Sequence, residues 1–349
     1  MPSTSLPPLF ITIGDPTGIG PEITVKWLTQ QTLFTQRPLH ILGCLEALTQ
    51  AANHLGLALP QHPAITYHSS VNPRNPLPGE TVVEALRMAV KGIAHYQQQH
   101  PQSLLKPGLV TGPLQKTHLW QAGYAHPGHT ELLSELASEC GLPITVPPDM
   151  LFVYQQLRVL LLTRHTPLGQ VLPSLTVEGI AQSLINAVSA LHAQGILNPT
   201  VTVWGVNPHA GEVGGTEERL LLKPAIALAA QVVQAHWVGP VAADGSVRGL
   251  NAQCPPADLY VAAYHDQGLM PIKLLGGWHT VNVTLGLPFW RMSVSHGTAN
   301  DIVGKDLASS DSLTAAAQLC HEWTHVVHPT WQTLPAWKTT QTNHSALLS

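Results

Sequence analysis

The sequence predicts an α/β protein whose helices cover a largely parallel β-sheet. Two observations support this fold class: short apolar runs alternate with helical patterns along most of the 349 residues, and the run at 259–264 carries no alternating polar side chains. Runs of this kind are typical of strands that helices cover on both faces. At this length the chain has room for two α/β domains or one large domain.

The predicted elements follow one another along the chain with turn residues between them. In chain order, the expected strands are 9–14, 39–42, 64–68, 108–112, 150–154, 157–163, 201–206, 259–264, 280–284 and 289–296. The expected helices are 21–31, 44–55, 80–98, 130–140, 176–194, 217–235 and 312–327. Pro21 and Glu22 suit the first turn of the first helix, because proline fixes a helical φ and a carboxylate complements the positive helix end. The tail from about 329 has no clear period, and we expect it to be peripheral.

Composition narrows the class of protein. Only 10% of the residues are charged, the formal net charge is −4, and no three basic residues are adjacent, which argues against a nucleic-acid partner. The apolar run at 159–162 is too short to span a bilayer. A secretory signal requires a basic residue near the N-terminus, and no Lys or Arg precedes Lys26. The four cysteines form no C-x-x-C pair. We therefore expect a cytoplasmic protein with no membrane contact.

Histidines follow the ends of three predicted strands. His165 follows the strand 157–163, His209 follows 201–206, and His265 follows 259–264 directly. In open α/β sheets, ligand-binding residues gather at the carboxyl ends of strands, so these imidazoles can meet around one divalent cation with open positions for a substrate. Asp266 can then act as a base or orient a ligand. The chain holds 20 histidines, so three unrelated loop histidines are the alternative.

A predicted anion pocket follows the third histidine. Lys273 lies just beyond the "YHDQG" turn, and the alternation of side chains in the next two strands places Asn282 and Arg291 on polar faces that can adjoin. Such groups bind phosphate or carboxylate, Arg as a two-pronged donor and Lys as a point charge. The alternative is a solvated face with a surface arginine.

Two further segments are candidate cleft walls. In "HPGHTELL", backbone amides at a helix start, with His129 and the Thr130 hydroxyl, can bind an anion; the alternative is that both residues only cap the helix. "GDPTGIGPE" follows the first strand but lacks the third glycine of a dinucleotide fingerprint, since Ile23 stands there. Asp15 and Glu22 would also repel a pyrophosphate. We expect this loop to form a cleft wall, not a standard Rossmann site.

Taken together, these stretches resemble the 4-hydroxythreonine-4-phosphate dehydrogenase family of pyridoxal 5′-phosphate biosynthesis. The matching segments, in family order from residue 14 to about 304, are "GDPTGIGPE", "TGPLQK", "PGHTE", "VNPHAGE", "YHDQGL", "VNVTLGLPFWRMSVSHGTA" and "DIVG". Each segment alone is weak evidence, whereas the ordered set is specific.

The resemblance implies a two-domain fold like that of isocitrate and isopropylmalate dehydrogenases, with largely parallel sheets and an active-site cleft between the domains. We expect residues 1–125 plus 285–330 to form the first domain, 126–284 to form the second domain with the dimer contacts, and 331–349 to form a peripheral tail. The resemblance also implies a homodimer that shares its metal sites between subunits. NAD or NADP is the implied cofactor, and the residues that bind it are unknown.

The resemblance further implies an activity and its residues. The expected reaction is metal-dependent oxidation of 4-phosphooxy-L-threonine at the C3 hydroxyl, followed by decarboxylation to 3-amino-2-oxopropyl phosphate. One zinc, magnesium or cobalt ion would be held by His165, His209 and His265. The substrate would be bound by His129, Thr130, Lys273, Asn282 and Arg291. Candidates for the proton transfers are Lys273, Asp266 and Asp244.

Three departures from the family pattern leave the substrate open. Ser295 stands where we expect an aspartate, Gln115 stands where histidine is common, and the residues after Asp244 differ from the usual continuation. One alternative is the same chemistry on another phosphorylated four-carbon hydroxy acid, a phosphothreonate or phosphoerythronate. A second is a non-redox relative that binds phosphate or transfers an acyl group.

Overall fold

The computed structural model describes residues 6–71, 77–126 and 128–325, and it contains one mixed β-sheet of eleven strands in the order β3-β2-β1-β4-β11-β10-β5-β6-β9-β7-β8. The strands are β1 Leu9–Thr12, β2 Leu39–Gly43, β3 Ile65–Ser69, β4 Gly108–Thr111, β5 Asp149–Tyr154, β6 Leu157–Leu161, β7 Thr200–Trp204, β8 His236–Val241, β9 Leu259–Ala262, β10 Val281–Leu285 and β11 Trp290–Ser293. The predicted mixed α/β class with a largely parallel sheet is confirmed.

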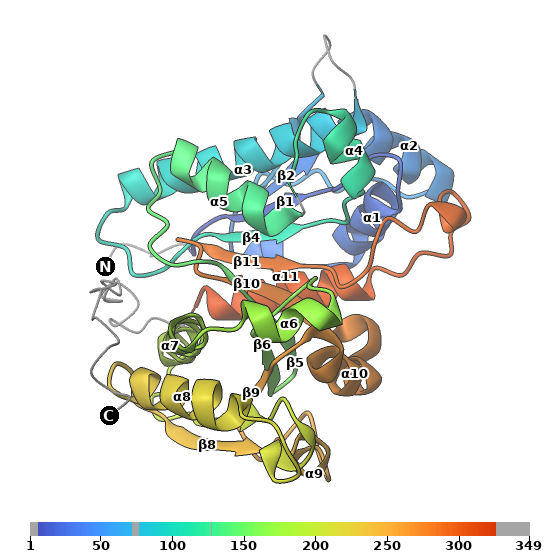
Figure 1. Ribbon diagram of the computed structural model, residues 1–349. Coiled ribbons are helices and arrows are strands. Elements are labelled where there is room, and N and C mark those ends of the chain that lie inside the picture. Colours follow the sequence, from blue (N-terminus) through green and yellow to red (C-terminus); the bar gives the residue numbers. More distant parts are fainter. Residues whose placement is uncertain (1–5, 72–76, 127, 326–349) are drawn as a thin grey trace.

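The sheet consists of two parallel groups that run in opposite directions. β3, β2, β1, β4 and β11 are parallel to one another, and so are β6, β9, β7 and β8. Between them, β10 is antiparallel to both β11 and β5, and β5 is antiparallel to β6. β10 and β5 therefore lie between the two parallel groups, near the middle of the sheet, and β5 forms a hairpin with β6, the first strand of the second group (Figure 1).

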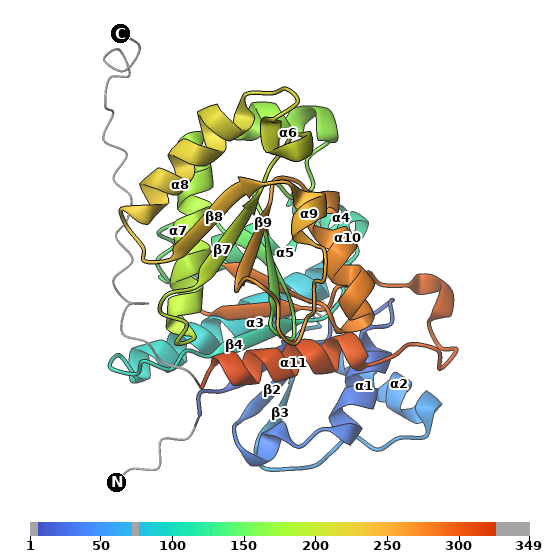
Figure 2. The same cartoon turned by 90° about the horizontal axis from the view of Figure 1, so that it is seen from below.

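Helices cover both faces of this sheet. The α-helices are α1 Gly20–Gln30, α2 Leu45–Leu55, α3 Pro78–Gln99, α4 Lys116–Gln121, α5 His129–Glu139, α6 Leu168–Ser174, α7 Val177–Ala193, α8 Lys223–Ala230, α9 Ala243–Ser246, α10 His265–Gly276 and α11 Asp311–Trp323. Short 3₁₀ turns lie at Leu33–Thr35, Pro208–Gly211, Gly277–His279 and Asn300–Ile302, and a π-helical turn lies at Glu218–Leu222. Figure 2 shows α11 crossing beneath the sheet, with α10 beside β9.

The core differs between the two faces. On one face a single apolar cluster runs the length of the sheet and packs against α1, α7, α8 and α11. On the other face there are two clusters, one with α3 and α5 over β1, β2 and β4, and one with α10 over β5, β6 and β9. The strip of sheet between these two clusters carries polar side chains, and the candidate site lies there.

Each strand predicted from the sequence is present, with ends that differ by up to three residues, and β8 is a strand that the sequence analysis missed. β8 contains Gly239 and Pro240, which argue against a strand by composition. Pro240 is tolerated because β8 is an edge strand of the sheet, where a residue without a backbone N–H need not break a hydrogen bond between two interior strands. The helix predicted over 217–235 is a π-helical turn that continues into α8 and ends at Ala230.

The predicted "YHDQG" turn is wrong, because α10 begins at His265 itself. Gly268 and Pro271 lie inside this helix, and because both residues have low helix propensity the sequence did not indicate a helix here. Gly268 is required by packing: a Cβ there would lie 2.5 Å from Leu161 Cδ2 and 3.0 Å from Val159 Cγ1. The close approach of α10 to β6 therefore depends on this glycine.

The predicted domain boundaries stay a prediction. The strands of 1–125 and β11 occupy one end of the sheet, and the strands of 126–284 occupy the other. The sheet itself is continuous across that division. The tail 331–349 lies outside the described residues.

Among the residues that the structure describes, no single helix is both long and apolar enough to cross a membrane. One pair passes that test only when taken together, α6 with α7, and the two are bent by 93° relative to each other.

Candidate active site

A cavity of about 180 Å³ opens on the polar strip of the sheet. Its floor is set by strand register. Asn282 of β10 pairs with Ser293 of β11, and Ser293 pairs in turn with Thr111 of β4, so their side chains point to the same face. Thr284 pairs with Arg291 and shares this face. The prediction that Asn282 and Arg291 adjoin on one polar face is confirmed.

Arg291 is the charged group of the floor and is only 2% exposed. Its Nη1 donates to Thr284 Oγ1 (2.9 Å) and its Nη2 to Thr111 Oγ1 (2.6 Å), whereas Nε is buried without a partner. No carboxylate of the described residues forms an ion pair with it. Burial lowers the pKa of Arg291 to about 9, against a weaker raising effect of Glu131. A buried cation held by neutral hydroxyls is suited to receive an anion.

The opposite wall is the first turn of α5, which contributes Gly128, His129, Thr130 and Glu131 to the cavity lining. Burial, followed by the nearby Arg291, lowers the pKa of His129 well below its usual value, so the imidazole is neutral. His129 Nε2 and Asn282 Oδ1 are both buried and unpartnered. The neutral His129 ring can donate from Nε2–H to an anion, which favours the anion-binding hypothesis over a purely structural helix start.

The three strands that precede the predicted metal histidines are neighbours in the sheet. β6, β9 and β7 lie side by side and run parallel, so their carboxyl ends meet at one edge. His165 and His265 come together there, with ring centroids 5.9 Å apart. Burial is the largest cause that lowers the pKa of His165, followed by the positive charge of Lys116. Neutral imidazole is the form that binds a metal.

The donor chemistry at this edge fits a divalent cation for two ligands. His265 Nδ1 lies 2.7 Å from Asp266 Oδ1, so Nδ1–H donates to the carboxylate and Nε2 keeps its lone pair. This carboxylate–imidazole arrangement is common among metal-binding histidines. Among the described residues of one chain, no group of three His, Cys, Asp or Glu side chains is placed to hold a metal.

His209 lies on an exposed loop after β7. It adopts a left-handed conformation with φ 52°, as does Ala210 with φ 54°, which is strained for both residues. The buried carboxylate of Glu218 holds this loop: its Oε1 accepts from the backbone N–H of Val206 (2.8 Å) and of Asn207 (2.7 Å). Burial alone would raise the pKa of Glu218, but the hydrogen bonds from Asn207 and Val206 lower it. The Glu218 carboxylate therefore holds the backbone that precedes His209, and His209 does not join the other two histidines within one chain.

The candidates for proton transfer do not line the cavity. Lys273 is exposed on α10, and its Nζ contacts the backbone carbonyl of Ser295 at 3.4 Å, beside the lining residue Val294. Asp266 is bonded to His265, and Asp244 is exposed on α9. Of the three, Lys273 is placed beside a lining residue.

Sequence reasoning missed two charged residues that line the cavity. Arg164 precedes His165, and its Nη1 is buried without a partner. Arg164 Nη2 lies 3.7 Å from Oε1 of Glu131, the second missed residue. The signal for Arg164 was its position next to a predicted ligand, whereas Glu131 looked like an ordinary acidic residue in a first helical turn.

The glycine-rich loop lies next to a segment that begins at the cavity. His296 lines the cavity, and two residues later the Thr298 carbonyl accepts a hydrogen bond from Ile19 N (3.0 Å). A Cβ on Gly18 would lie 2.7 Å from Thr298 Cβ, so only glycine permits this contact. The loop does not line the anion cavity. It borders a neighbouring cavity of about 230 Å³, together with α2 and the segment at Val303.

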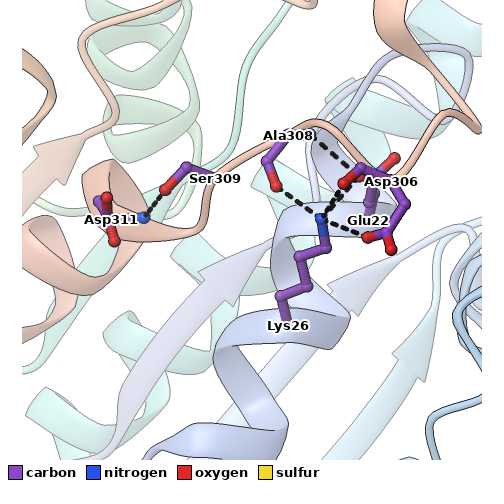
Figure 3. A network of polar contacts seen from close by, with 6 residues as sticks. All are labelled: Glu22, Lys26, Asp306, Ala308, Ser309 and Asp311. Atoms are coloured by element: carbon purple, nitrogen blue, oxygen red, sulfur yellow. Dashed lines mark hydrogen bonds and ion pairs between the residues drawn. The ribbon is translucent and has the colours of Figure 1, made fainter.

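A polar network fixes the later part of this segment against α1 (Figure 3). Lys26 Nζ lies 2.9 Å from Glu22 Oε1 and 2.8 Å from Asp306 Oδ1, and it donates to the Ala308 carbonyl at 2.7 Å. Ala308 N donates to Glu22 Oε1 at 3.1 Å. Glu22, expected only to complement the helix end, thus also anchors the segment that runs from the cavity to α11.

The fold and the cavity define a class: an α/β protein with a cavity lined by a buried arginine, beside a pair of histidines at a strand edge. The sequence matches the family described as pyridoxal phosphate biosynthetic protein PdxA over residues 37–320. The chain belongs to this family.

Similar proteins agree with this assignment. The chain is 35% identical to the 4-hydroxythreonine-4-phosphate dehydrogenase of Synechocystis sp., with 92% of this chain and 97% of the relative covered. It is 37% identical to the protein of the same name from Synechococcus sp. (strain JA-3-3Ab), with 92% and 95% covered. A crystal structure of 4-hydroxythreonine-4-phosphate dehydrogenase from Klebsiella pneumoniae matches with a TM-score of 0.72 at 32% identity, covering 90% of this chain and 99% of that one.

Proposed function

We propose that this protein is a cytoplasmic, metal-dependent dehydrogenase that oxidises 4-phosphooxy-L-threonine at its C3 hydroxyl with NAD or NADP. The oxidised product then loses carbon dioxide to give 3-amino-2-oxopropyl phosphate. One observation carries the proposal: Arg291, a buried arginine that pairs with no carboxylate among the described residues, lines the same cavity as His165, whose ring lies beside that of His265. Family membership agrees with the activity.

The chain's own residues bind and orient the substrate in this proposal. The phosphate lies against Arg291, with the free Nε2 of His129, the Asn282 side chain and Thr130 around it. Met150 and Val294 contribute apolar side chains to the same lining. A buried anion site that is formed before the ligand arrives orients the rest of the substrate toward the histidines.

The histidines His165, His209 and His265 would hold the cation. A divalent cation such as zinc, magnesium or cobalt supplies Lewis-acid activation of a hydroxyl, and a nicotinamide cofactor supplies the hydride acceptor. Asp266 fixes the His265 ring, and Lys273 Nζ is the group that we propose to move the proton.

A homodimer completes the site in this proposal. His209 does not meet His165 and His265 within one chain, so the trio needs a second copy. α10, which begins at His265, also carries two strongly exposed apolar side chains, Met270 (71%) and Leu274 (87%). Apolar side chains this exposed favour a protein contact beside the metal ligands.

A substrate panel tests the function. Purified protein is incubated with 4-phosphooxy-L-threonine, a phosphothreonate or a phosphoerythronate, with NAD or NADP, with and without a chelator. We expect reduced cofactor and carbon dioxide from the first substrate, and loss of both with chelator. Turnover of the phosphothreonate or phosphoerythronate alone would show that the substrate is a hydroxy acid and not 4-phosphooxy-L-threonine. Intact cation binding with no redox turnover would favour the non-redox alternative.

The metal site has its own test. We expect His209→Ala to lose bound cation and turnover while circular dichroism and size-exclusion profiles stay unchanged. His236→Ala, at an exposed histidine that starts β8, is the matched control and should keep both. A metal-free His209→Ala protein with full activity would refute the assignment.

A further inference from the structure

Glu131 is a carboxylate inside a cavity that is otherwise lined by cations and neutral groups. It shares the lining with Lys116, Arg164 and Arg291. Among the described residues its carboxylate has no hydrogen bond and one ion pair, the 3.7 Å contact with Arg164, which exceeds hydrogen-bonding distance. Its charge also acts on Arg291 and His165, whose pKa values it raises slightly against the larger effect of burial.

A carboxylate at this position opposes a ligand that carries only negative charges. Arg291 and His129 prepare the cavity for an anion, and a fixed like charge close by repels that anion. Stabilising the start of α5 does not require this placement, because an acidic side chain in a first turn acts equally well when it faces solvent. The position is useful when the ligand also carries a positive charge.

We propose that Glu131 binds the α-ammonium group of the substrate and so selects a phosphorylated amino acid over the matching hydroxy acid. The inference rests on the proposed function and chooses between its substrates. 4-Phosphooxy-L-threonine has an ammonium group at C2, where the phosphothreonate and phosphoerythronate have a hydroxyl. Glu131 is a specificity-determining residue in this scheme.

Arg164 completes the recognition of the amino-acid end. Its Nη1 is buried and unpartnered in the cavity wall, while its Nη2 faces Glu131. The carboxylate at C1 is bonded to the carbon that bears the ammonium group, so neighbouring opposite charges on the protein match neighbouring opposite charges on the ligand. The 3.7 Å separation leaves both side chains free to take ligand partners.

The test compares Glu131→Gln with a matched control on the same helix. Glu135 lies one helical turn further along α5, pairs with His126 at 3.1 Å and does not line the cavity. For Glu131→Gln, we expect kcat/KM for 4-phosphooxy-L-threonine to fall about 10- to 100-fold, as for a lost charged hydrogen bond, while kcat/KM for the hydroxy acids holds or rises. Glu135→Gln should leave the ratio of the two unchanged. An unchanged ratio in Glu131→Gln overturns the inference.

A binding arm separates this inference from the activity. O-phospho-L-serine and 3-phospho-L-glycerate share a phosphate, a carboxylate and the configuration at C2, and they differ only by ammonium or hydroxyl at that carbon. Calorimetric titration of wild type should favour phosphoserine, and Glu131→Gln should abolish that preference even if no substrate is oxidised. Glu131→Asp, which keeps the charge, should retain part of it. Equal affinity of wild type for the two ligands, or a preference that survives in a folded Glu131→Gln protein, overturns the proposal.

Discussion

Replacement of Arg291 by methionine should make the ligand-free protein more stable and at the same time unable to hold its substrate. Burial lowers the pKa of this arginine from 12.5 to about 9. At about 1.36 kcal/mol per pKa unit, the buried charge therefore costs on the order of 5 kcal/mol in the free protein. The guanidinium recovers part of this through its hydrogen bonds to Thr111 and Thr284, about 1 kcal/mol each.

Methionine fills most of the same volume and carries no charge. Exchanges of buried ions for apolar side chains often stabilise a fold by about 1–4 kcal/mol, and we expect a rise of about 2 kcal/mol in the free energy of unfolding of Arg291→Met. The loss of the guanidinium should raise KM for a phosphorylated substrate at least about 30-fold, which corresponds to about 2 kcal/mol of a charged hydrogen bond.

Thermal unfolding with and without substrate measures both effects. Wild type with ligand at about 100 times Kd should gain about 2.7 kcal/mol, whereas Arg291→Met should gain nothing. The control is Arg158→Met: Arg158 is also buried, but its Nη1 donates to the Gln156 carbonyl (2.8 Å) and it lies away from the cavity. That variant should keep its KM and its stabilisation by substrate. A destabilised Arg291→Met protein that substrate still protects would refute the reasoning.

The remaining predictions concern packing, loop support and pH. Gly268→Ala should lower the free energy of unfolding by about 1–3 kcal/mol, because its Cβ would meet Leu161 at 2.5 Å, whereas Gly169→Ala, with open space in α6, should be close to neutral in chemical denaturation. Glu218→Gln should cost about 1–3 kcal/mol by the same measurement and reduce bound cation, since the new NH2 group would face the Asn207 Nδ2 donor from which Oε2 accepts at 3.0 Å. Burial lowers the pKa of His40 to about 4, so stability should fall as the pH drops from about 6.5 toward about 4, and His40→Gln should flatten this slope.

Each of these predictions has a contradicting result. Full stability of Gly268→Ala would mean that α10 can move away from β6 without cost. Normal cation content in Glu218→Gln would show that the loop of His209 needs no carboxylate. An unchanged acid slope in His40→Gln would place the acid-sensitive groups elsewhere. In the folded state His40 stays neutral where the unfolded chain would bind a proton, which fixes the sign of the slope.

Much of the fold is predictable because strand signals are local. An apolar run with no polar alternation reports burial on both faces, and every such run became a strand. Asn282 and Arg291 were predictable from a different local signal, because period-two alternation and a short connection fix which face they share. β8 and α10 were not, because Gly239, Pro240, Gly268 and Pro271 are tolerated there by tertiary context: an edge position for β8 and a close helix-to-sheet contact for α10.

The candidate site shows the limit of local reasoning. The two histidines near the strand ends could be predicted, because His165 and His265 follow apolar runs that are recognisable as strands. Glu131 and Arg164 face each other across segments that are separated in sequence, and nothing local reports that contact. Among the described residues of one chain His209 does not join the other two histidines, and only the proposed dimer would bring the three together.

The position of His265 on α10 couples two equilibria under the proposed dimer. The same helix carries a cation ligand and the exposed apolar side chains Met270 and Leu274. Whatever ion the dimer binds more tightly than the monomer must, by thermodynamic reciprocity, tighten the dimer by the same factor. Dilution would then release the bound cation, and a chelator would weaken the association of the two subunits. Specific activity would rise with protein concentration until the protein is fully dimeric.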